Sequence, residues 1–178
     1  MQLHQVKKIA IIGTESTGKS TLTRQLAAHY NTIWCPEYAR AYLHENGKEY
    51  SYDDLLKIAV GQCTLEDALL LEADNNLYFV DTEMYVMKVW SEFVFGKCHE
   101  FILSEIAERK YDLFLLCNID LPWVADELRE YPEEAPRKQL HNIYRDIMIN
   151  QNTPWVEISG NENERLQKAI EAVENFCR

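Results

Sequence analysis

The stretch Gly13-Thr14-Glu15-Ser16-Thr17-Gly18-Lys19-Ser20 decides the fold, because it matches the phosphate-loop pattern G-x-x-x-x-G-K-[ST] throughout. An apolar run at 9–12 precedes it and a helical pattern at 21–28 follows it. A buried strand, a glycine turn and a helix N-terminus form the setting in which such a loop binds phosphate. The sequence therefore predicts a nucleoside-triphosphate site at the end of the first strand.

The residue types of this loop suit phosphate chemistry. Gly13 and Gly18 let backbone N–H groups turn toward one point. Lys19 is expected to reach the β- and γ-phosphates of ATP, and the Ser20 hydroxyl to ligate Mg²⁺. ATP and Mg²⁺ are therefore the expected cofactors. The predicted nucleotide-binding residues are Gly13, Glu15, Ser16, Thr17, Gly18, Lys19, Ser20 and Thr21.

Length, charge and cysteine usage narrow the class of protein. The 178 residues suit one domain, and a net charge of -11 argues against a sequence-independent grip on nucleic acid. No apolar run approaches the roughly 20 residues of a membrane span, and the polar start at 1–8 argues against a signal peptide. Five scattered cysteines without a C-x-x-C pair favour a reducing, cytoplasmic location. Nothing in the sequence indicates the oligomeric state.

Strand and helix patterns alternate along the chain. Strands are expected at 7–12, 32–35, 77–80, 113–117 and 153–158, and helices at 18–30, 37–46, 51–73, 84–95, 100–110, 138–150 and 162–176. This alternation predicts an α/β fold, a three-layer sandwich around a five-stranded parallel sheet. Ligands of such sheets bind beyond the carboxyl ends of the strands, so the polar residues that follow each strand are the candidate site.

Asp81 ends the apolar run at 77–80, as a Walker B carboxylate does. It is expected to hold Mg²⁺, directly or through water, opposite Ser20. The alternative is a helix N-cap, for which Asp is also favoured. A signalling GTPase is disfavoured, because no glycine follows Asp81 at the γ-phosphate-sensing position and 118–120 does not match the guanine-reading pattern Asn-Lys-x-Asp.

Glu37 follows Pro36 at the end of the second strand, where a carboxylate can take a proton from an attacking hydroxyl or bind a ribose. Arg40 lies one helical turn further on and is expected to face the same cleft. The alternative is a surface ion pair between Glu37 and Arg40, which would contribute a few tenths of a kcal/mol. The residues alone leave both interpretations open.

A polar segment at about 121–137 has the composition of a lid. Arg129 or Arg137 is expected to swing over the transferring phosphoryl group, although either arginine can instead belong to an acidic surface face. Trp123 is a candidate for stacking on a base or ring, or for the core. Gly160 and Asn161 follow the last strand and are candidates for the adenine side of the site, with a helix-capping turn as the alternative.

These residues together resemble a known family, the ribosylnicotinamide kinase domain of the bifunctional bacterial nicotinamide-nucleotide adenylyltransferase/ribosylnicotinamide kinase. The similarity includes the phosphate loop, Glu37-Tyr38-Ala39-Arg40, Asp81-Thr82-Glu83 and the segment Leu121-Pro122-Trp123-Val124-Ala125-Asp126-Glu127-Leu128-Arg129. The phosphate loop is shared by many families, whereas the other stretches are more particular.

The resemblance implies ATP-dependent phosphorylation of the 5′-hydroxyl of nicotinamide riboside, which gives nicotinamide mononucleotide. It implies catalytic roles for Lys19, Glu37, Asp81 and Arg129, with either Glu37 or Asp81 as the base. It also implies a substrate-binding set of Glu37, Tyr38, Arg40, Asp81 and Trp123. In the bifunctional proteins an adenylyltransferase domain precedes this one, whereas the first strand here begins near Lys7. We therefore expect a stand-alone kinase domain and keep another small acceptor open.

Two classes of function compete at this stage. The first is a small-molecule kinase, of nicotinamide riboside or of another nucleoside. The second is an ATP-hydrolysing regulatory module that acts through a protein partner. The Glu37/Arg40 pair and the polar lid favour the kinase, because a switch does not need an acceptor side. Glu15 argues against it, because a carboxylate in the phosphate loop repels phosphates unless it faces away.

Overall fold

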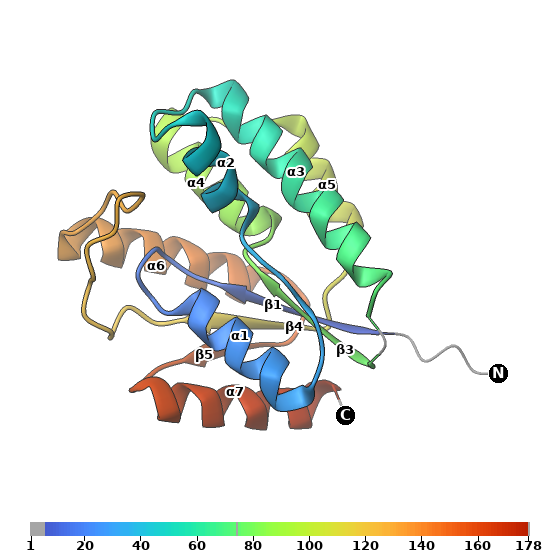
Figure 1. Cartoon of the computed structure of the whole chain (residues 1–178). Helices are drawn as coiled ribbons and strands as arrows, with labels where there is room; N and C mark the ends of the chain where they lie inside the picture. The colour runs from blue at the N-terminus through green and yellow to red at the C-terminus, as the bar shows by residue number, and fades with distance from the viewer. Residues whose placement is uncertain (1–5, 74, 178) are drawn as a thin grey trace.

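The computed structural model describes residues 6–73 and 75–177. Its five strands are β1 (Lys7–Ile12), β2 (Trp34–Cys35), β3 (Leu77–Asp81), β4 (Leu113–Cys117) and β5 (Trp155–Ile158). They form one parallel sheet in the order β2-β3-β1-β4-β5 (Figure 1). The predicted fold class is confirmed. Residues 1–5 of the polar start at 1–8 lie outside the described residues.

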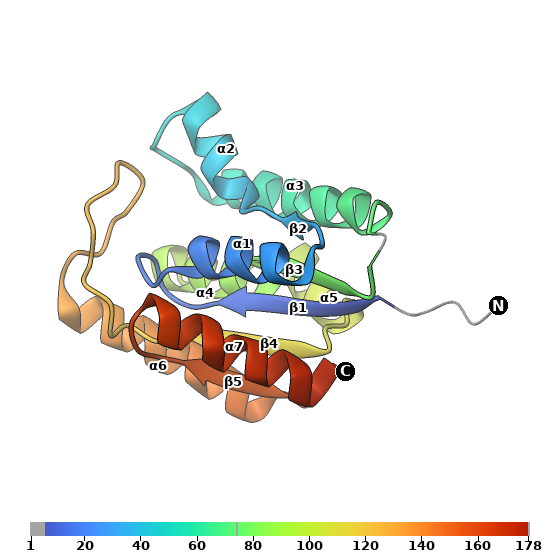
Figure 2. The same cartoon turned by 60° about the horizontal axis from the view of Figure 1, so that its bottom comes forward.

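Helices cover both faces of the sheet. Helices α1 (Lys19–Tyr30) and α7 (Glu162–Cys177) lie on one face, and α4 (Met84–Phe95) and α6 (Glu134–Asn150) lie on the other (Figures 1 and 2). Residues of β1 alternate between the two cores, because successive side chains of a strand point to opposite faces. Ile9 and Ile11 pack beneath α1 and α7, whereas Ala10 and Ile12 pack against α4 and α6.

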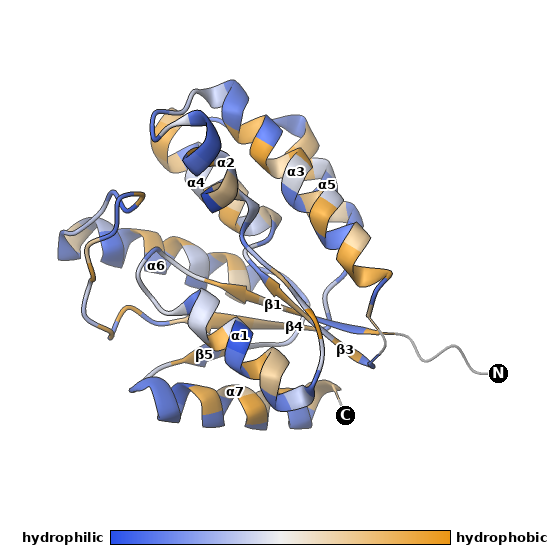
Figure 3. Ribbon diagram, viewed as in Figure 1, coloured by the Kyte–Doolittle hydropathy of each residue, from blue (hydrophilic) through white to orange (hydrophobic). Residues whose placement is uncertain are grey.

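Hydropathy follows this layering. The strands are coloured as hydrophobic along most of their length, whereas the flanking helices carry both kinds of residue (Figure 3). A strand buried on both faces needs apolar side chains throughout, whereas a helix buries only one side. No helix among the described residues combines the length and the apolar character needed to cross a membrane.

A second helical group extends beyond the β2 edge of the sheet. Helices α2 (Tyr38–Asn46), α3 (Tyr52–Leu70) and α5 (Glu100–Glu108) share an apolar core with α4. The N-terminus of α3 is fixed by a capping box. The backbone N–H of Asp54 donates to the Ser51 hydroxyl, and the backbone N–H of Ser51 donates to the Asp54 carboxylate at 2.9 Å.

A buried ion cluster joins this helical group to the sheet. The carboxylate of Glu66 on α3 is 1% exposed and lies 2.5 Å from the Lys8 ammonium and 3.4 Å from the Arg109 guanidinium. The Tyr111 hydroxyl donates to the same carboxylate at 2.8 Å. Three partners offset the desolvation of this carboxylate, so the cluster fixes how α3 meets β1.

The polar segment after β4 is shorter than predicted. Helix α6 begins at Glu134, not at 138, so residues 134–137 of the expected lid form its first turn. Pro136 lies in this first turn, where a proline is tolerated because its missing N–H has no intrahelical partner. The connection between β4 and α6 therefore spans 118–133.

Gly61 is required by the contact between α2 and α3. A Cβ atom at position 61 would lie 2.1 Å from Cε1 of the Tyr38 ring. Helix propensity alone predicts that Gly61→Ala stabilises the protein by about 1 kcal/mol. We predict instead that it destabilises the protein by roughly 1–3 kcal/mol, because the rigid ring must move out of a packed core. Urea unfolding measures the change.

As a control, Gly61→Ala is also made in a Tyr38→Ala variant, which lacks the ring. In that variant we expect Gly61→Ala to leave the free energy of unfolding unchanged or to increase it. An equal destabilisation in both backgrounds would contradict the packing explanation.

Candidate functional site

The phosphate loop joins β1 to α1 in a tight turn. Gly13 has φ +137° and lies so close to β4 that a Cβ atom there would be 2.8 Å from the Cys117 carbonyl oxygen. Gly18, at φ +78°, is the N-cap of α1. The Thr17 hydroxyl donates to the Thr14 carbonyl oxygen at 2.8 Å. Only glycine fits the first position, since both the backbone angle and the neighbouring strand exclude a side chain there.

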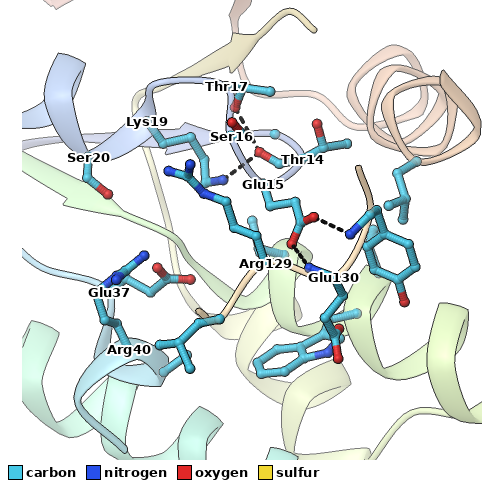
Figure 4. Close-up of a pocket in the computed structure, with 18 of the residues that line it drawn as sticks. Thr14, Glu15, Ser16, Thr17, Lys19, Ser20, Glu37, Arg40, Arg129 and Glu130 are labelled. Atoms are coloured by element: carbon cyan, nitrogen blue, oxygen red, sulfur yellow. Dashed lines mark hydrogen bonds between the residues drawn. The ribbon is translucent and has the colours of Figure 1, made fainter. Parts of the chain in front are cut away.

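Lys19 lies across the inside of this loop. Its ammonium group donates to the Thr14 carbonyl oxygen at 2.7 Å (Figure 4). Ser20 follows in the first turn of α1 with its side chain exposed. The loop thus presents a cation, a hydroxyl and a helix N-terminus to one region of space, which is the arrangement an anion needs.

The loop forms one side of a pocket of about 430 Å³. Four groups of residues line the pocket. Three of them are loop and α1 residues 13–21, the residues Glu37, Arg40 and Lys48 around α2, and the lid residues 127–131. The fourth is a set of aromatic side chains, here called the aromatic wall, which consists of Tyr50, Trp90, Phe93, Tyr131 and Tyr144. Four cationic side chains, Lys19, Arg40, Lys48 and Arg129, thus line the pocket beside four glutamates, although the chain as a whole has a net charge of -11.

Asp81 ends β3 beside the loop and is 1% exposed. Its Oδ1 has no hydrogen-bond partner among the described residues. Burial, followed by the negative charge of Glu37, raises the pKa of the Asp81 carboxyl, whereas Lys19 and the Ser20 hydroxyl oppose the rise. A carboxylate oxygen without a partner beside Ser20 fits Mg²⁺, which commonly binds one or two protein oxygens and keeps several waters.

Thr82 has a strained backbone directly after Asp81. Its φ is +74°, a left-handed conformation that is rare for a β-branched residue. Its Oγ1 is buried without a hydrogen-bond partner in the described part of the chain. Strain of this kind persists where the surrounding structure holds it, and here it turns the chain between β3 and α4.

Glu37 and Arg40 both line the pocket, but they do not pair with each other as the surface alternative required. The Arg40 guanidinium donates to the Asp126 carboxylate of the lid at 3.1 Å. Glu37 is half-buried at the N-cap of α2, and its charge acts on Asp81. The structure thus brings Lys19, Ser20, Glu37 and Asp81 together at the carboxyl ends of β1, β2 and β3.

The structure separates the two lid arginines. Arg129 lines the pocket, and its side chain extends toward the phosphate loop (Figure 4). It also donates to the Val124 carbonyl oxygen within the lid. Arg137 is 7% exposed and donates to the Leu121 carbonyl oxygen at 3.4 Å. Arg129 is therefore the lid arginine that faces the nucleotide site.

The Glu15 carboxylate, on the pocket wall, binds the backbone of the lid and the Trp123 side chain. The Glu15 carboxylate accepts the backbone N–H of Glu130 at 2.9 Å and that of Tyr131 at 2.5 Å (Figure 4). The Trp123 indole N–H lies 3.4 Å from the same carboxylate. Glu15 lines the pocket, but its carboxylate is bound by two lid N–H groups, which offset part of the negative charge that would repel ATP. Trp123 is not among the residues that line the pocket, so its predicted stacking on substrate has no support here.

Three further predicted site residues have structural roles. The Tyr38 ring packs against Gly61, and Tyr38 is not among the residues that line the pocket. Asn161 caps α7 by accepting the backbone N–H groups of Asn163 and Glu164. Gly160 donates its N–H to Asp120 at 2.6 Å. The last two observations match the capping turn that the sequence left open, and adenine contacts at these positions stay a prediction.

Sequence reasoning missed Arg165, which ties the turn after β5 to the phosphate loop. Arg165 is 3% exposed and donates to the carbonyl oxygens of Thr17 at 3.0 Å, Asn118 at 2.9 Å and Gly160 at 2.7 Å. It also pairs with Asp120. The only signal in the sequence was an arginine on a helix that otherwise presents an apolar face.

The aromatic wall was also missed. Trp90 and Phe93 lie one turn apart on α4, and their sequence pattern indicated only a buried helix. Tyr50 joins this wall to the lid, because its hydroxyl accepts from the Trp90 indole N–H at 2.9 Å and donates to Glu130 at 2.8 Å. The wall is assembled from four segments of the chain, so no local pattern could predict it.

Residues 8–165 match a protein family described as AAA domain, and the chain belongs to this family. It is also similar to the trifunctional NAD biosynthesis/regulator protein NadR of Escherichia coli, with 33% identity over 173 residues. This alignment includes 94% of the chain and 42% of the relative. The chain therefore spans less than half the length of this curated relative.

Two solved structures share the fold and the arrangement of elements. A NadR protein in complex with NR has a TM-score of 0.82 and 25% identity, over 96% of this chain and 51% of that one. A NadR protein in complex with NAD and AMP-PNP has a TM-score of 0.75 and 25% identity, over 96% and 49%. The predicted resemblance is thereby confirmed.

The Glu83 carboxyl, next to the site, makes the stability of the folded protein depend on pH. The side chain is 2% exposed and accepts the backbone N–H of Tyr85 at the N-terminus of α4. Burial raises the pKa of its carboxyl from an ordinary 4.5 to about 8. Between these two pH values the folded protein binds a proton that the unfolded chain has released, so this group makes the protein less stable as pH rises.

We predict that Glu83→Gln removes this dependence of stability on pH. From pH 5 to pH 8 the free energy of unfolding of the variant should rise relative to that of the parent by on the order of 1 kcal/mol per pH unit. Urea unfolding at several pH values measures the difference, with the exposed Glu45→Gln as the control. A difference that stays constant over this range would show that Glu83 is ionised in the folded protein.

Proposed function

We propose that the chain is an ATP-dependent kinase that transfers the γ-phosphoryl group of ATP to the 5′-hydroxyl of nicotinamide riboside, giving nicotinamide mononucleotide for NAD synthesis. The observation that carries the proposal is one pocket in which a phosphate loop faces an acceptor-side carboxylate and an aromatic wall. The similarity to NadR structures with NR and with AMP-PNP supports the two substrates.

The nucleotide side is formed by the phosphate loop. Lys19 leaves the Thr14 carbonyl and binds the β- and γ-phosphates, while the N–H groups of the loop bind their oxygens. Ser20 and Asp81 are the residues that would hold Mg²⁺. When bound there, Mg²⁺ neutralises charge on the phosphates. Five free thiols in the described residues fit a reducing, cytoplasmic setting for this reaction.

The acceptor side is formed by Glu37. Of the two candidate bases, Glu37 lines the pocket whereas Asp81 is buried beneath it, next to Ser20. We therefore infer that Glu37 accepts the proton of the attacking 5′-hydroxyl. A bond forms between that oxygen and the γ-phosphorus, the bond to the β-phosphate oxygen breaks, and ADP leaves. Arg129 offsets the negative charge that builds up on the transferring group.

The aromatic wall supports a flat, cationic acceptor. Tyr50, Trp90 and Phe93 line the pocket beside Glu130, and the rings of Tyr50 and Trp90 meet edge to face with centroids 4.8 Å apart. Aromatic faces and a nearby carboxylate both attract a positively charged ring, and nicotinamide riboside carries one. A neutral nucleoside would gain the stacking without the charge attraction.

ADP release from Mg·ATP, with and without acceptor, tests the proposed function. We predict strong stimulation by nicotinamide riboside, with nicotinamide mononucleotide as the product, and weak stimulation by ordinary nucleosides. Lys19→Ala is the matched control and should lower turnover by at least about 10²-fold without changing the melting temperature, because Lys19 acts on phosphate charge. Stimulation by another nucleoside would replace the substrate. Hydrolysis that no acceptor stimulates would favour an ATPase that acts through a protein partner.

Glu37→Gln tests the assignment of the base. We predict that this variant lowers kcat by about 10²–10⁴-fold, because an amide cannot accept the hydroxyl proton. Binding of AMP-PNP should stay within about threefold of the parent, since Glu37 faces the acceptor. An equal loss of nucleotide binding would make Glu37 a structural residue.

A further inference from the structure

The phosphate loop carries a carboxylate that phosphate binding does not explain. Glu15 lies between the two loop glycines, at a position where a carboxylate facing inward would repel ATP. Its carboxylate instead points to the lid and accepts two backbone N–H groups, from Glu130 at 2.9 Å and Tyr131 at 2.5 Å (Figure 4). The loop therefore uses its one acidic side chain to hold another segment.

A second contact joins the loop to the other side of the same lid segment. The Ser16 hydroxyl accepts the backbone N–H of Val124 at 2.9 Å. The chain between these attachment points, 124–131, contains Arg129, whose guanidinium donates to the Val124 carbonyl oxygen. Two anchors on the loop thus fix the segment that carries the lid arginine of the pocket.

The same segment is attached to the acceptor side. Asp126 accepts from Arg40 of α2 at 3.1 Å, and Glu130 accepts from the Tyr50 hydroxyl at 2.8 Å. Glu127 lies 3.1 Å from the His44 ring. The lid therefore contacts the phosphate loop through Glu15 and Ser16, and the acceptor wall through acidic side chains of its own.

We propose that Glu15 is a positioning residue, which holds the lid segment 124–131 on the phosphate loop so that Arg129 faces the phosphoryl group during transfer. This inference rests on the proposed kinase function. Glu15 acts through the lid backbone and not on ATP, because its carboxylate binds N–H groups of Glu130 and Tyr131. Docking of the lid then places the arginine at the site where charge develops.

A double-mutant cycle separates this role from a general structural one. We expect Glu15→Ala to lower kcat for nicotinamide riboside phosphorylation by about 10–100-fold, the loss expected when a catalytic group is misplaced by about 1 Å. We expect Arg129→Ala to cause a loss of similar size. The double variant should be no slower than Arg129→Ala alone, because Glu15 has no further effect once the arginine is gone.

Two comparisons complete the design. Glu15→Gln keeps one carbonyl acceptor for the lid and should recover part of the rate. Glu133→Ala removes a carboxylate from the end of the same connection and should leave kcat unchanged, because Glu133 is the N-cap residue of α6 but its side chain makes no capping hydrogen bond. Losses of Glu15→Ala and Arg129→Ala that multiply in the double variant would overturn the proposal.

Trypsin cleavage after Arg129 gives a readout that does not depend on turnover. If Glu15 holds the lid in the parent, trypsin should cleave after Arg129 faster in Glu15→Ala than in the parent or in Glu133→Ala. The melting temperature should be unchanged. If the parent does not phosphorylate nicotinamide riboside, the proposed function fails, and the cleavage rates alone decide the role of Glu15. Equal cleavage rates in Glu15→Ala and the parent would overturn the proposed role of Glu15.

Discussion

The site depends on the close approach of Gly13 to the carbonyl oxygen of Cys117. Strands β1 and β4 are hydrogen-bonded neighbours, and the chain can leave β1 in a tight turn only because position 13 has no side chain. That turn directs the start of α1 toward the carboxyl edge of the sheet and presents Lys19 and Ser20 there. The same edge carries Glu37 and Asp81 at the ends of β2 and β3. One steric constraint therefore fixes the relative positions of the phosphate loop and the acceptor-side carboxylates.

Cationic and anionic side chains meet in the pocket. Lys19, Arg40, Lys48 and Arg129 line it together with four carboxylates, of which Glu15 is bound to the lid backbone. Glu37 and Asp81, at the ends of β2 and β3, are in different surroundings. Glu37 is half-buried on the pocket wall, and Asp81 is almost fully buried with one oxygen free of partners among the described residues. This difference in environment supports different roles, the base for Glu37 and the metal ligand for Asp81.

The sequence predicted the features that depend on local patterns. The phosphate loop, the five strands and the resemblance to NadR all follow from continuous stretches, and the structure and the comparisons bear them out. Arg165, Tyr50 and Trp90 were missed because their roles come from contacts between distant segments. The substrate-binding roles of Tyr38 and Trp123 stay predictions, and in the structure the Tyr38 ring packs against Gly61 and the Trp123 indole contacts Glu15. The polar composition of 121–137 predicts a lid up to position 137, but its last four residues form the first turn of α6, which a polar sequence with a proline does not prevent.

We propose that one pocket holds the nucleotide and the acceptor together, with the lid between them. Calorimetric titration of nicotinamide riboside into the protein, alone and saturated with Mg²⁺ and AMP-PNP, tests this arrangement. We predict that one equivalent of each ligand binds per chain at the same time, and that saturation with AMP-PNP does not abolish binding of the riboside. Mutual exclusion of the two ligands would contradict it, because phosphoryl transfer in this pocket requires both to be bound at once.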